Sequence, residues 1–290
     1  MRNKAMRIDS HQHFWRYSKA THGWIDDSMA VIRRDFGPED LAPELRASGI
    51  DACITVQVDQ TLDETRQMLA TADAHPWIAG VVGWVDLRSP NVRDQLRTFA
   101  NHPKFVGVRH IVQAEPDPRF ALQPEFQRGV AALAEFDLAY DVLVYPHQLP
   151  AAVELAARHP QQRFVLDHLA KPRIRARELQ PWARDLADFA RLPNTSCKLS
   201  GMVTEADVTG WRDEDLAPYA QVALDSFGPQ RLLYGSDWPV CLVAASHGRW
   251  FEWVCRWLAP LQPAERDAVL GGNAARVYGI QHSPDLRNGS

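Results

Sequence analysis

Short apolar segments alternate with amphipathic segments along almost the whole chain of 290 residues. The apolar segments are rich in Val, Ile, Leu and Phe, which is typical of strands buried on both faces of a parallel sheet. Eight strands are expected, at residues 6–9, 52–58, 78–85, 105–111, 139–144, 163–167, 195–200 and 232–235. The period of apolar residues predicts helices between and after them, at residues 38–48, 62–74, 91–100, 124–136, 150–158, 180–190, 213–226 and 246–258.

Eight strand–helix units in a chain of this length predict an α/β fold of the (β/α)8 TIM-barrel type. No linker-like segment interrupts the pattern, so we expect a single domain over residues 1–290. A doubly wound open sheet is the competing interpretation, and such folds usually carry a Gly-rich phosphate loop after the first strand. Here the first strand runs directly into Ser10-His11-Gln12-His13, which disfavours dinucleotide binding.

The composition and net charge indicate which kinds of partner the protein is not expected to bind. Hydrophobic residues make up 46% of the chain and charged residues 23%, with a net charge of -4, so neither nucleic acid nor an anionic membrane is expected as a partner. No apolar run approaches the roughly 20 residues that cross a bilayer, and no hydrophobic signal core follows the N-terminus. We expect a cytoplasmic protein. Its four cysteines form no Cys-x-x-Cys pair and are interpreted as free, mostly buried thiols.

The first predicted strand ends in a pair of histidines. Asp9, His11 and His13 occupy alternate positions, which share one face of an extended chain, so the two imidazoles can converge. Neutral imidazoles are good ligands for zinc. For the pair taken alone, a structural role as strand caps or backbone partners is an equally good interpretation.

Other predicted strands also end in polar or reactive residues. In a (β/α)8 barrel, the carboxyl ends of the strands form the active site. Buried charges cost free energy unless they are paired, so a barrel stabilised by packing alone does not need them there. The residues concerned are Arg109, His110, Tyr145, His147, Asp167, His168, Lys198 and Asp237.

Three of these motifs resemble the amidohydrolase superfamily: His11-Gln12-His13, Asp167-His168 and Gly235-Ser236-Asp237-Trp238-Pro239. Residues 165–172, 197–201 and 148–150 are similar to the branch of that superfamily that opens sugar lactones, and the resemblance covers residues 6–280. It implies a carboxylic ester hydrolase that converts a small-molecule sugar lactone, of the kind met in L-fucose catabolism, to the aldonic acid.

The resemblance also implies roles for individual residues. His11, His13, His168 and Asp237 fall on the family's metal-binding positions, and Asp237 is also expected to take a proton from the attacking water. The fourth strand offers Arg109 where many relatives have a bridging lysine or glutamate, which argues against two metals. We predict a site that can bind one zinc ion, and whether hydrolysis requires it stays open. Without zinc, Arg109, His168 and Lys198 would polarise the lactone carbonyl.

Aromatic residues near the strand ends are candidates for substrate contact, because aromatic faces pack well on the apolar side of sugar rings. The predicted substrate-binding residues are Trp15, Trp24, His110, Tyr145 and Trp238. By contrast, Trp250, Trp253 and Trp257 have helical spacing and are expected to pack a helix against the barrel. The oligomeric state does not follow from the sequence.

Two alternatives to a sugar lactonase remain at this stage. One is another reaction on the same scaffold, a decarboxylase or a hydrolase of aromatic lactones. An aromatic dicarboxylic lactone would need more arginines at strand ends than Arg109 alone. The other is a barrel that binds a sugar acid without turning it over, for which Asp237 opposite a histidine pair is more than binding requires.

Overall fold

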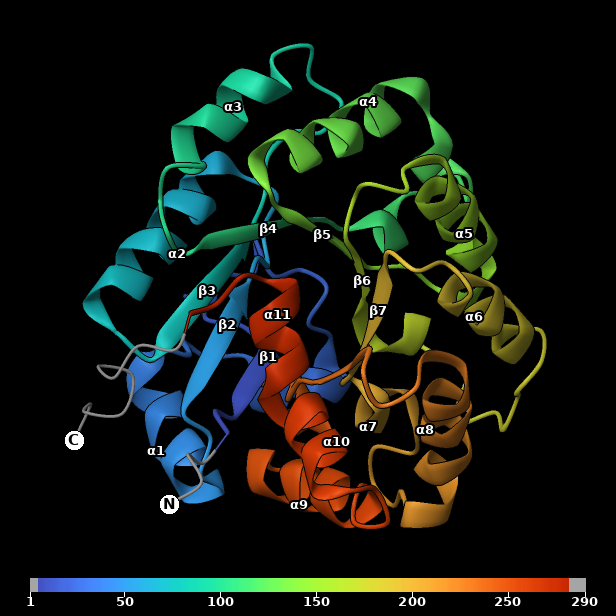
Figure 1. The fold of residues 1–290 in the computed structure, drawn as a ribbon. Coiled ribbons are helices and arrows are strands. Elements are labelled where there is room, and N and C mark those ends of the chain that lie inside the picture. Colours follow the sequence, from blue (N-terminus) through green and yellow to red (C-terminus); the bar gives the residue numbers. More distant parts are fainter. Residues whose placement is uncertain (1–4, 282–290) are drawn as a thin grey trace.

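A parallel sheet of eight strands forms a barrel enclosed by helices (Figure 1). The structure is a computed structural model and describes residues 5–281. The strands follow one another around the barrel in chain order, β1 to β8, and each pairs in parallel with the next. A parallel bridge between Gln12 and Trp238 joins the end of β1 to the loop after β8, and the His13 amide donates a 2.7 Å hydrogen bond to the Trp238 carbonyl. The predicted (β/α)8 barrel is confirmed.

All eight strands lie where the apolar segments predicted them, with different ends. The strands are β1 (Ile8–Gln12), β2 (Ala52–Val56), β3 (Ile78–Gly83), β4 (Phe105–His110), β5 (Ala139–Val142), β6 (Phe164–Leu166), β7 (Thr195–Leu199) and β8 (Leu232–Tyr234). Seven end one or two residues before the predicted limit, because the apolar pattern continues into buried loops. The exception is β1, which extends past residue 9 and includes His11.

The major helices also follow the predicted pattern. They are α1 (Pro38–Ser48), α2 (Leu62–Ala74), α3 (Val92–Phe99), α4 (Pro124–Leu133), α5 (Leu149–Arg158), α6 (Trp182–Ala190), α8 (Asp213–Phe227) and α9 (His247–Trp257). A 3-10 turn, Ala134–Phe136, accounts for the last predicted residues of α4. Three helices of four or five residues were not predicted, since they are too short for a helical period: α7 (Met202–Glu205), α10 (Pro263–Asp267) and α11 (Asn273–Val277).

The hydrophobic core has two parts. The larger part lies between the strands and the surrounding helices and includes Trp250 and Trp253 of α9, whose rings stack with centroids 5.3 Å apart. Their burial confirms the packing role that their spacing predicted. The smaller part fills the barrel interior with side chains such as Ile8, Ile54 and Val165, and Tyr278 after α11 packs against it. The amino-terminal end of the barrel is therefore filled, which leaves the opposite end for polar residues.

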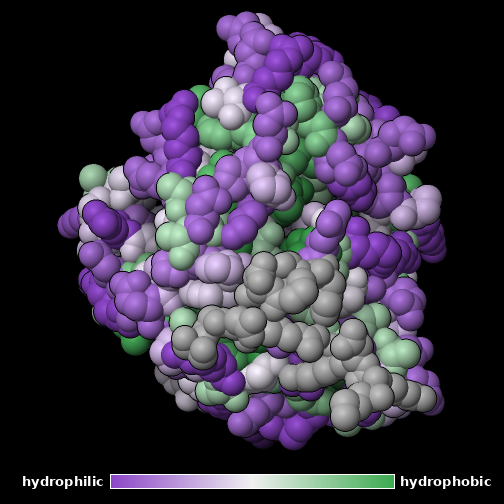
Figure 2. All heavy atoms as spheres, turned by 60° about the vertical axis from the view of Figure 1, so that its left-hand side comes forward, coloured by the Kyte–Doolittle hydropathy of each residue, from purple (hydrophilic) through white to green (hydrophobic). Residues whose placement is uncertain are grey.

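The surface is mainly hydrophilic, with small hydrophobic areas between polar side chains on the face shown in Figure 2. Within residues 5–281, no helix combines the length and the apolar character that crossing a membrane demands. The cysteines are free as predicted, with Cys53, Cys197 and Cys241 buried and Cys255 partly buried.

Candidate active site

Three imidazoles and one carboxylate meet at the carboxyl end of the barrel. The Nε2 atoms of His11 and His13 are 3.2 Å apart. The Oδ1 atom of Asp237 lies 3.4 Å from Nε2 of His13 and 3.8 Å from Nε2 of both His11 and His168. One carboxylate oxygen, from the loop after β8, therefore faces three imidazole nitrogens. The imidazoles come from β1 and from the loops after β1 and β6.

The closure of the barrel holds the two histidines of the first strand in place. The Asp237 amide donates a 2.8 Å hydrogen bond to the His11 carbonyl, and Nδ1 of His13 is 2.8 Å from the Val56 carbonyl. Asp9, expected on the same face, instead accepts a 2.8 Å hydrogen bond from the Ser236 amide. The pairing of β1 with β2 has a register shift between Asp9 and Gln12, so the regular alternation of a strand does not hold over these residues.

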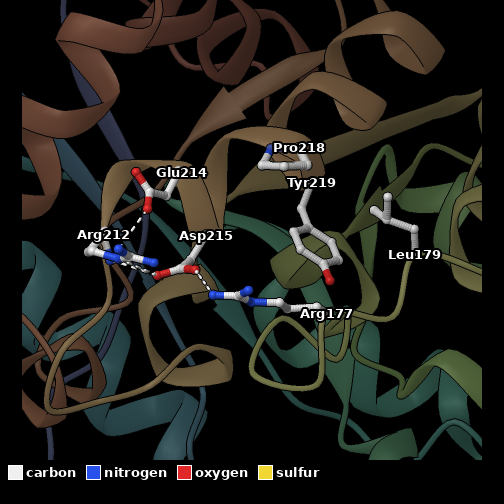
Figure 3. A pocket seen from close by; sticks show the side chains of 7 residues that line it. All are labelled: Arg177, Leu179, Arg212, Glu214, Asp215, Pro218 and Tyr219. Carbon is white, nitrogen blue, oxygen red and sulfur yellow. Dashed lines mark hydrogen bonds and ion pairs between the residues drawn. The ribbon is translucent and has the colours of Figure 1, made fainter.

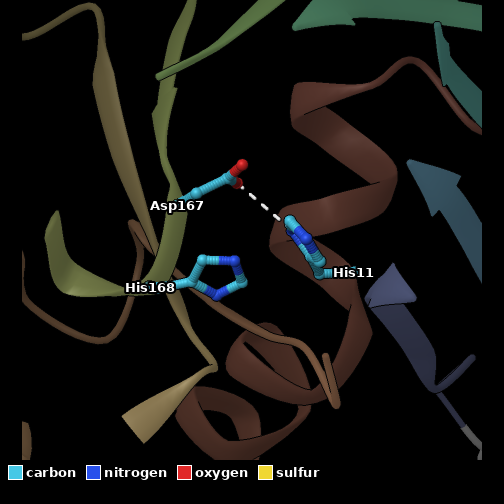
Figure 4. A group of neighbouring side chains, drawn as sticks. All are labelled: His11, Asp167 and His168. Atoms are coloured by element: carbon cyan, nitrogen blue, oxygen red, sulfur yellow. Dashed lines mark ion pairs between the residues drawn. The ribbon is translucent and has the colours of Figure 1, made fainter. Parts of the chain in front are cut away.

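Behind the histidines lies a layer of buried ion pairs. Arg109 lies 3.1 Å from Asp167, and Lys198 lies 3.1 Å from Asp167 and 2.5 Å from Asp141. His11 joins this layer to the histidines, because its Nδ1 is 3.2 Å from Asp167 and 3.1 Å from Lys198. Figure 4 shows His11, Asp167 and His168 turned toward one another. We call these eight residues the polar cluster: His11, His13, Arg109, Asp141, Asp167, His168, Lys198 and Asp237.

The turn that carries His168 has an unusual backbone. Four successive non-glycine residues, from His168 to Lys171, have positive φ angles between 52° and 59°. Such left-handed conformations are unfavourable for residues with a side chain and persist only where the surroundings hold them. Here Nδ1 of His168 is 2.9 Å from the Ser200 hydroxyl. The hydroxyl fixes the ring so that its Nε2 faces Asp237.

The cluster stabilises ionised carboxylates and neutral imidazoles. Burial opposes ionisation of Asp237, but His168, His13 and His11 outweigh it and hold its pKa below the usual range. For Asp167 the charges of Lys198 and His11 likewise outweigh burial and hold the pKa well below its ordinary value. Burial lowers the pKa of His168 to about 4 and that of His11 well below 6.5. At neutral pH, Asp237 is therefore a proton acceptor and these two imidazoles are uncharged.

Asp141 differs from the other two carboxylates. Burial raises its pKa to about 6, and the negative charge of Asp167 adds to the rise, even though Lys198 lies beside it and lowers the pKa. The Tyr278 hydroxyl donates a 2.7 Å hydrogen bond to Asp141. Tyr278, which follows α11, thus contacts the Asp141–Lys198 ion pair from inside the barrel.

The donor set fits a zinc-class metal. His11, His13 and Asp237 offer two imidazole nitrogens and one carboxylate oxygen within 4.8 Å of one another, and His11, Asp167 and His168 form a second such group. Ligand bonds of about 2.0–2.1 Å in a tetrahedral site separate ligand atoms by roughly 3.3 Å, and the three donors are 3.2, 3.4 and 3.8 Å apart. Neutral imidazole and ionised carboxylate are also the forms that bind metal.

Among the predicted substrate-binding residues, His110 is corrected by the structure. Side chains alternate across a strand, and Arg109 points into the barrel, so His110 points outward. Its ring stacks on Phe120 at 5.1 Å, and its Nε2 is 2.8 Å from Glu115. His110 belongs to the packing layer between β4 and the helices.

Two of the predicted tryptophans are also core residues. Trp238 is 2% exposed and packs edge-to-face on Phe36, with ring centroids 5.2 Å apart. Trp15 packs on the same phenylalanine and donates a 2.9 Å hydrogen bond to the Arg34 carbonyl. Packing therefore accounts for both positions, and the contact of these two residues with substrate stays a prediction. Trp24 and Tyr145 are 45% and 38% exposed, and their contact with substrate stays a prediction.

The structure places three further residues in or beside the cluster that the sequence motifs do not include: Gln57, Asp141 and Tyr278. A charged residue inside an otherwise apolar strand is a signal that could have found Asp141. Gln57 accepts a 3.0 Å hydrogen bond from Arg109, and Tyr278 comes from the far end of the barrel. Neither has a local sequence signal.

A cavity of about 370 Å³ lies apart from the polar cluster, between the loop after β6 and the start of α8 (Figure 3). Leu179, Pro218 and Tyr219 form its apolar wall. Arg177 and Arg212 also line it, but each pairs with acids of α8. None of its lining residues belongs to the cluster, so we place the candidate site at the barrel mouth.

Comparisons with known proteins agree with this architecture. The amidohydrolase family matches residues 8–280. An L-fucono-1,5-lactonase of Burkholderia multivorans is 45% identical over an alignment of 294 residues, which covers 98% of this chain and 99% of the relative. An L-fucono-1,5-lactonase of Burkholderia ambifaria is 39% identical over 281 residues, which cover 94% of this chain and 96% of the relative. A crystal structure of a Burkholderia multivorans amidohydrolase with bound zinc is 45% identical, with a TM-score of 0.92 over 96% of this chain and 100% of the other. This chain therefore belongs to the amidohydrolase family.

Proposed function

We propose that this protein hydrolyses a sugar lactone, of the L-fuconolactone type, to the aldonic acid in the cytoplasm. One observation carries the proposal: an ionised carboxylate oxygen of Asp237 facing three imidazoles at the mouth of the barrel. The similarity to L-fucono-1,5-lactonases over nearly the whole chain supports this substrate class.

Asp237 acts as the general base. It accepts a proton from water as the water oxygen bonds to the lactone carbonyl carbon. When the bond between that carbon and the ring oxygen breaks, the leaving alkoxide takes the proton and the ring opens. The lowered pKa of Asp237 keeps the carboxylate ionised at neutral pH but also makes it a weak base. Its contribution to the rate must therefore come mainly from its position beside the reacting water.

His168 is placed to stabilise the developing oxyanion. When the Ser200 hydroxyl donates to its Nδ1, the proton of the neutral ring resides on Nε2, which faces Asp237 and the barrel mouth. That N–H can donate to the carbonyl oxygen. Arg109 and Lys198, both buried against His11, add positive charge behind it. Loss of one good oxyanion donor typically costs about 3–4 kcal/mol of barrier lowering.

We further propose that His11, His13 and Asp237 hold one zinc ion, with His168 beside it. Bound there, zinc would supply Lewis acidity to the carbonyl and lower the pKa of water. The zinc-bound structure of the Burkholderia multivorans amidohydrolase supports the choice of metal. Arg109 lies 3.3 Å from Nε2 of His11, and this fixed cation weakens the affinity of the site for a dication.

A pH-indicator assay of acid release tests the proposal. Metal-stripped and zinc-loaded protein are each assayed with sugar 1,5- and 1,4-lactones, an aromatic dicarboxylic lactone and unsubstituted δ-valerolactone. The proposal expects the highest kcat/KM for a sugar lactone. Hydrolysis confined to the aromatic lactone would contradict the substrate class, and the absence of any hydrolysis would favour the binding-only barrel.

A further inference from the structure

We infer that Lys171 and Glu205 form a recognition subsite for the hydroxyl groups of the substrate ring and make the enzyme specific for polyhydroxylated lactones. The inference rests on the proposed function and deepens it. Neither residue belongs to the polar cluster, and neither has a role in the chemistry described above.

Both residues lie a few residues after cluster residues or their hydrogen-bond partners in the chain. Lys171 is three residues after His168, and Glu205 is five residues after Ser200. Their side chains meet across the two loops, with Lys171 Nζ 4.0 Å from Glu205 Oε1. The Arg175 amide donates a 2.9 Å hydrogen bond to the Glu205 carbonyl and ties the loops together. The pair is therefore fixed relative to the histidine that faces Asp237.

The strained turn after β6 sets the direction of Lys171. Its backbone is left-handed, with a φ of 52°, and its amide donates a 2.7 Å hydrogen bond to the His168 carbonyl. Lys171 Nζ lies 5.7 Å from the ring centre of Tyr145, which is partly exposed. One turn thus orients both a cluster imidazole and an ammonium group beside an aromatic face at the surface.

The pair is less deeply buried than the cluster. Burial raises the pKa of Glu205, and the negative charge of Asp237 raises it further. The side chains of Lys171 and Glu205 are 20% and 24% exposed, whereas those of His168 and Asp237 are 4% and 6% exposed. The pair thus lies between the buried cluster and solvent.

The pair retains most of its hydrogen-bonding capacity. A separation of 4.0 Å is too long for a hydrogen bond, and within residues 5–281 neither charged group donates or accepts one. An ammonium has three donors, and a carboxylate can accept from two hydroxyls. A ring with hydroxyls on neighbouring carbons can satisfy both groups at once, with Tyr145 against its apolar face. A lactone without hydroxyls leaves both partly buried charges without these partners, and such sites discriminate strongly.

Two single variants test the inference, Lys171→Met and Glu205→Gln. Each is assayed with the sugar lactone that the wild type hydrolyses best and with δ-valerolactone, a lactone of similar ring that has no hydroxyls. We expect kcat/KM for the sugar lactone to fall at least tenfold in each variant, mainly through KM. For δ-valerolactone we expect kcat/KM within about twofold of the wild type.

A matched control comes from the same loop. Glu178 pairs with Arg173 at 3.0 Å on the exposed side of the loop after β6. Glu178→Gln removes an ion pair of the same kind and should leave the kinetics with both substrates unchanged. Thermal melting of all three variants establishes that they fold.

The failure of the inference can be distinguished from the failure of the proposed function. Wild-type kinetics in both Lys171→Met and Glu205→Gln, or an equal loss of kcat/KM with both substrates, would overturn the inference while the proposed function stands. If the wild type hydrolyses no sugar lactone, the proposed function fails and the inference fails with it.

Discussion

His11 contacts both parts of the site: the histidines and Asp237 at the barrel mouth, and the layer of buried ion pairs behind them. Its Nε2 faces His13 and Asp237, and its Nδ1 faces Asp167 and Lys198. The cluster holds three carboxylates against two cations, which leaves one net negative charge before the imidazoles are counted. A dication or a bound proton would offset that charge, which explains how the same residues suit both a metal and general base catalysis.

The titration of His168 makes the folded state sensitive to acid. Its pKa is about 4 in the folded protein, because of burial, and about 6.5 in an unfolded chain. As the pH falls below 6.5, the unfolded chain binds a proton that the folded protein does not, so this residue lowers stability progressively down to about pH 4. Between pH 7 and pH 5 we expect a loss of about 2 kcal/mol from His168.

Urea unfolding at both pH values, for the wild type and for His168→Gln, measures this contribution. The variant lacks the titrating group, so its free energy of unfolding should depend less on pH by about 2 kcal/mol over that range. Equal pH dependence in the two proteins would mean that His168 is protonated in the folded state near its ordinary pKa.

Most of the cluster residues could be predicted from the sequence, because the barrel fold itself specifies where they meet. His11, His168, Lys198 and Asp237 all stand at or just after strand ends. The direction of His110 could not be predicted, because it depends on which side of β4 faces the interior. Partners drawn from other elements, such as Asp141, follow from the packed structure and not from spacing along the chain.

At the scale of elements, the turn between β7 and α7 controls the site. Gly201 has a φ of 64°, and a Cβ atom there would lie 2.6 Å from Nδ1 of His168. Gly201→Ala therefore displaces the imidazole as well as straining the turn. We expect a fall in kcat/KM of at least tenfold and a loss of about 1 kcal/mol in unfolding free energy.

Gly49 provides a matched control. Its backbone is also left-handed, with a φ of 63°, but the nearest atom to a Cβ there would be Nη1 of Arg7 at 3.7 Å, which is an ordinary contact. Gly49→Ala should strain its turn in the same way and leave kcat/KM unchanged. A Gly201→Ala enzyme as active as Gly49→Ala would show that the position of the His168 ring is not critical.

The eight strands and eight longer helices could be predicted because each has enough residues to display a period. The strand ends could not, since apolar residues continue beyond Val56 and Val142 into buried loops. The helices α7 and α11 could not be predicted because each is little more than one turn long. Such a helix shows no period in the sequence and is stabilised by its tertiary packing. Both lie next to the candidate site, because α7 carries Glu205 and Tyr278 directly follows α11.

At the scale of the whole molecule, the seam that closes the barrel is also the site. The hydrogen bonds that join β1 to the loop after β8 involve the backbones of His11, His13 and Asp237. A ligand that binds these three side chains therefore stabilises the closed barrel. Zinc at 100 times its Kd should add about 2.7 kcal/mol of stability.

Thermal melting with and without zinc measures this coupling. We expect Tm to rise by several degrees in the wild type and not in His13→Asn, which loses a ligand. His75→Asn, a change at the end of α2 far along the chain from the seam, is the control and should respond like the wild type. An equal rise in His13→Asn would place the zinc elsewhere.

The most direct measurement is the comparison of Asp237→Asn with the wild type in hydrolysis and in binding of the same sugar lactone. The amide preserves shape but cannot accept the proton from water, so we expect kcat to fall at least a thousandfold while calorimetry gives a Kd within tenfold of the wild-type KM. Hydrolysis by Asp237→Asn within tenfold of the wild-type rate would contradict the central claim that this carboxylate activates the water.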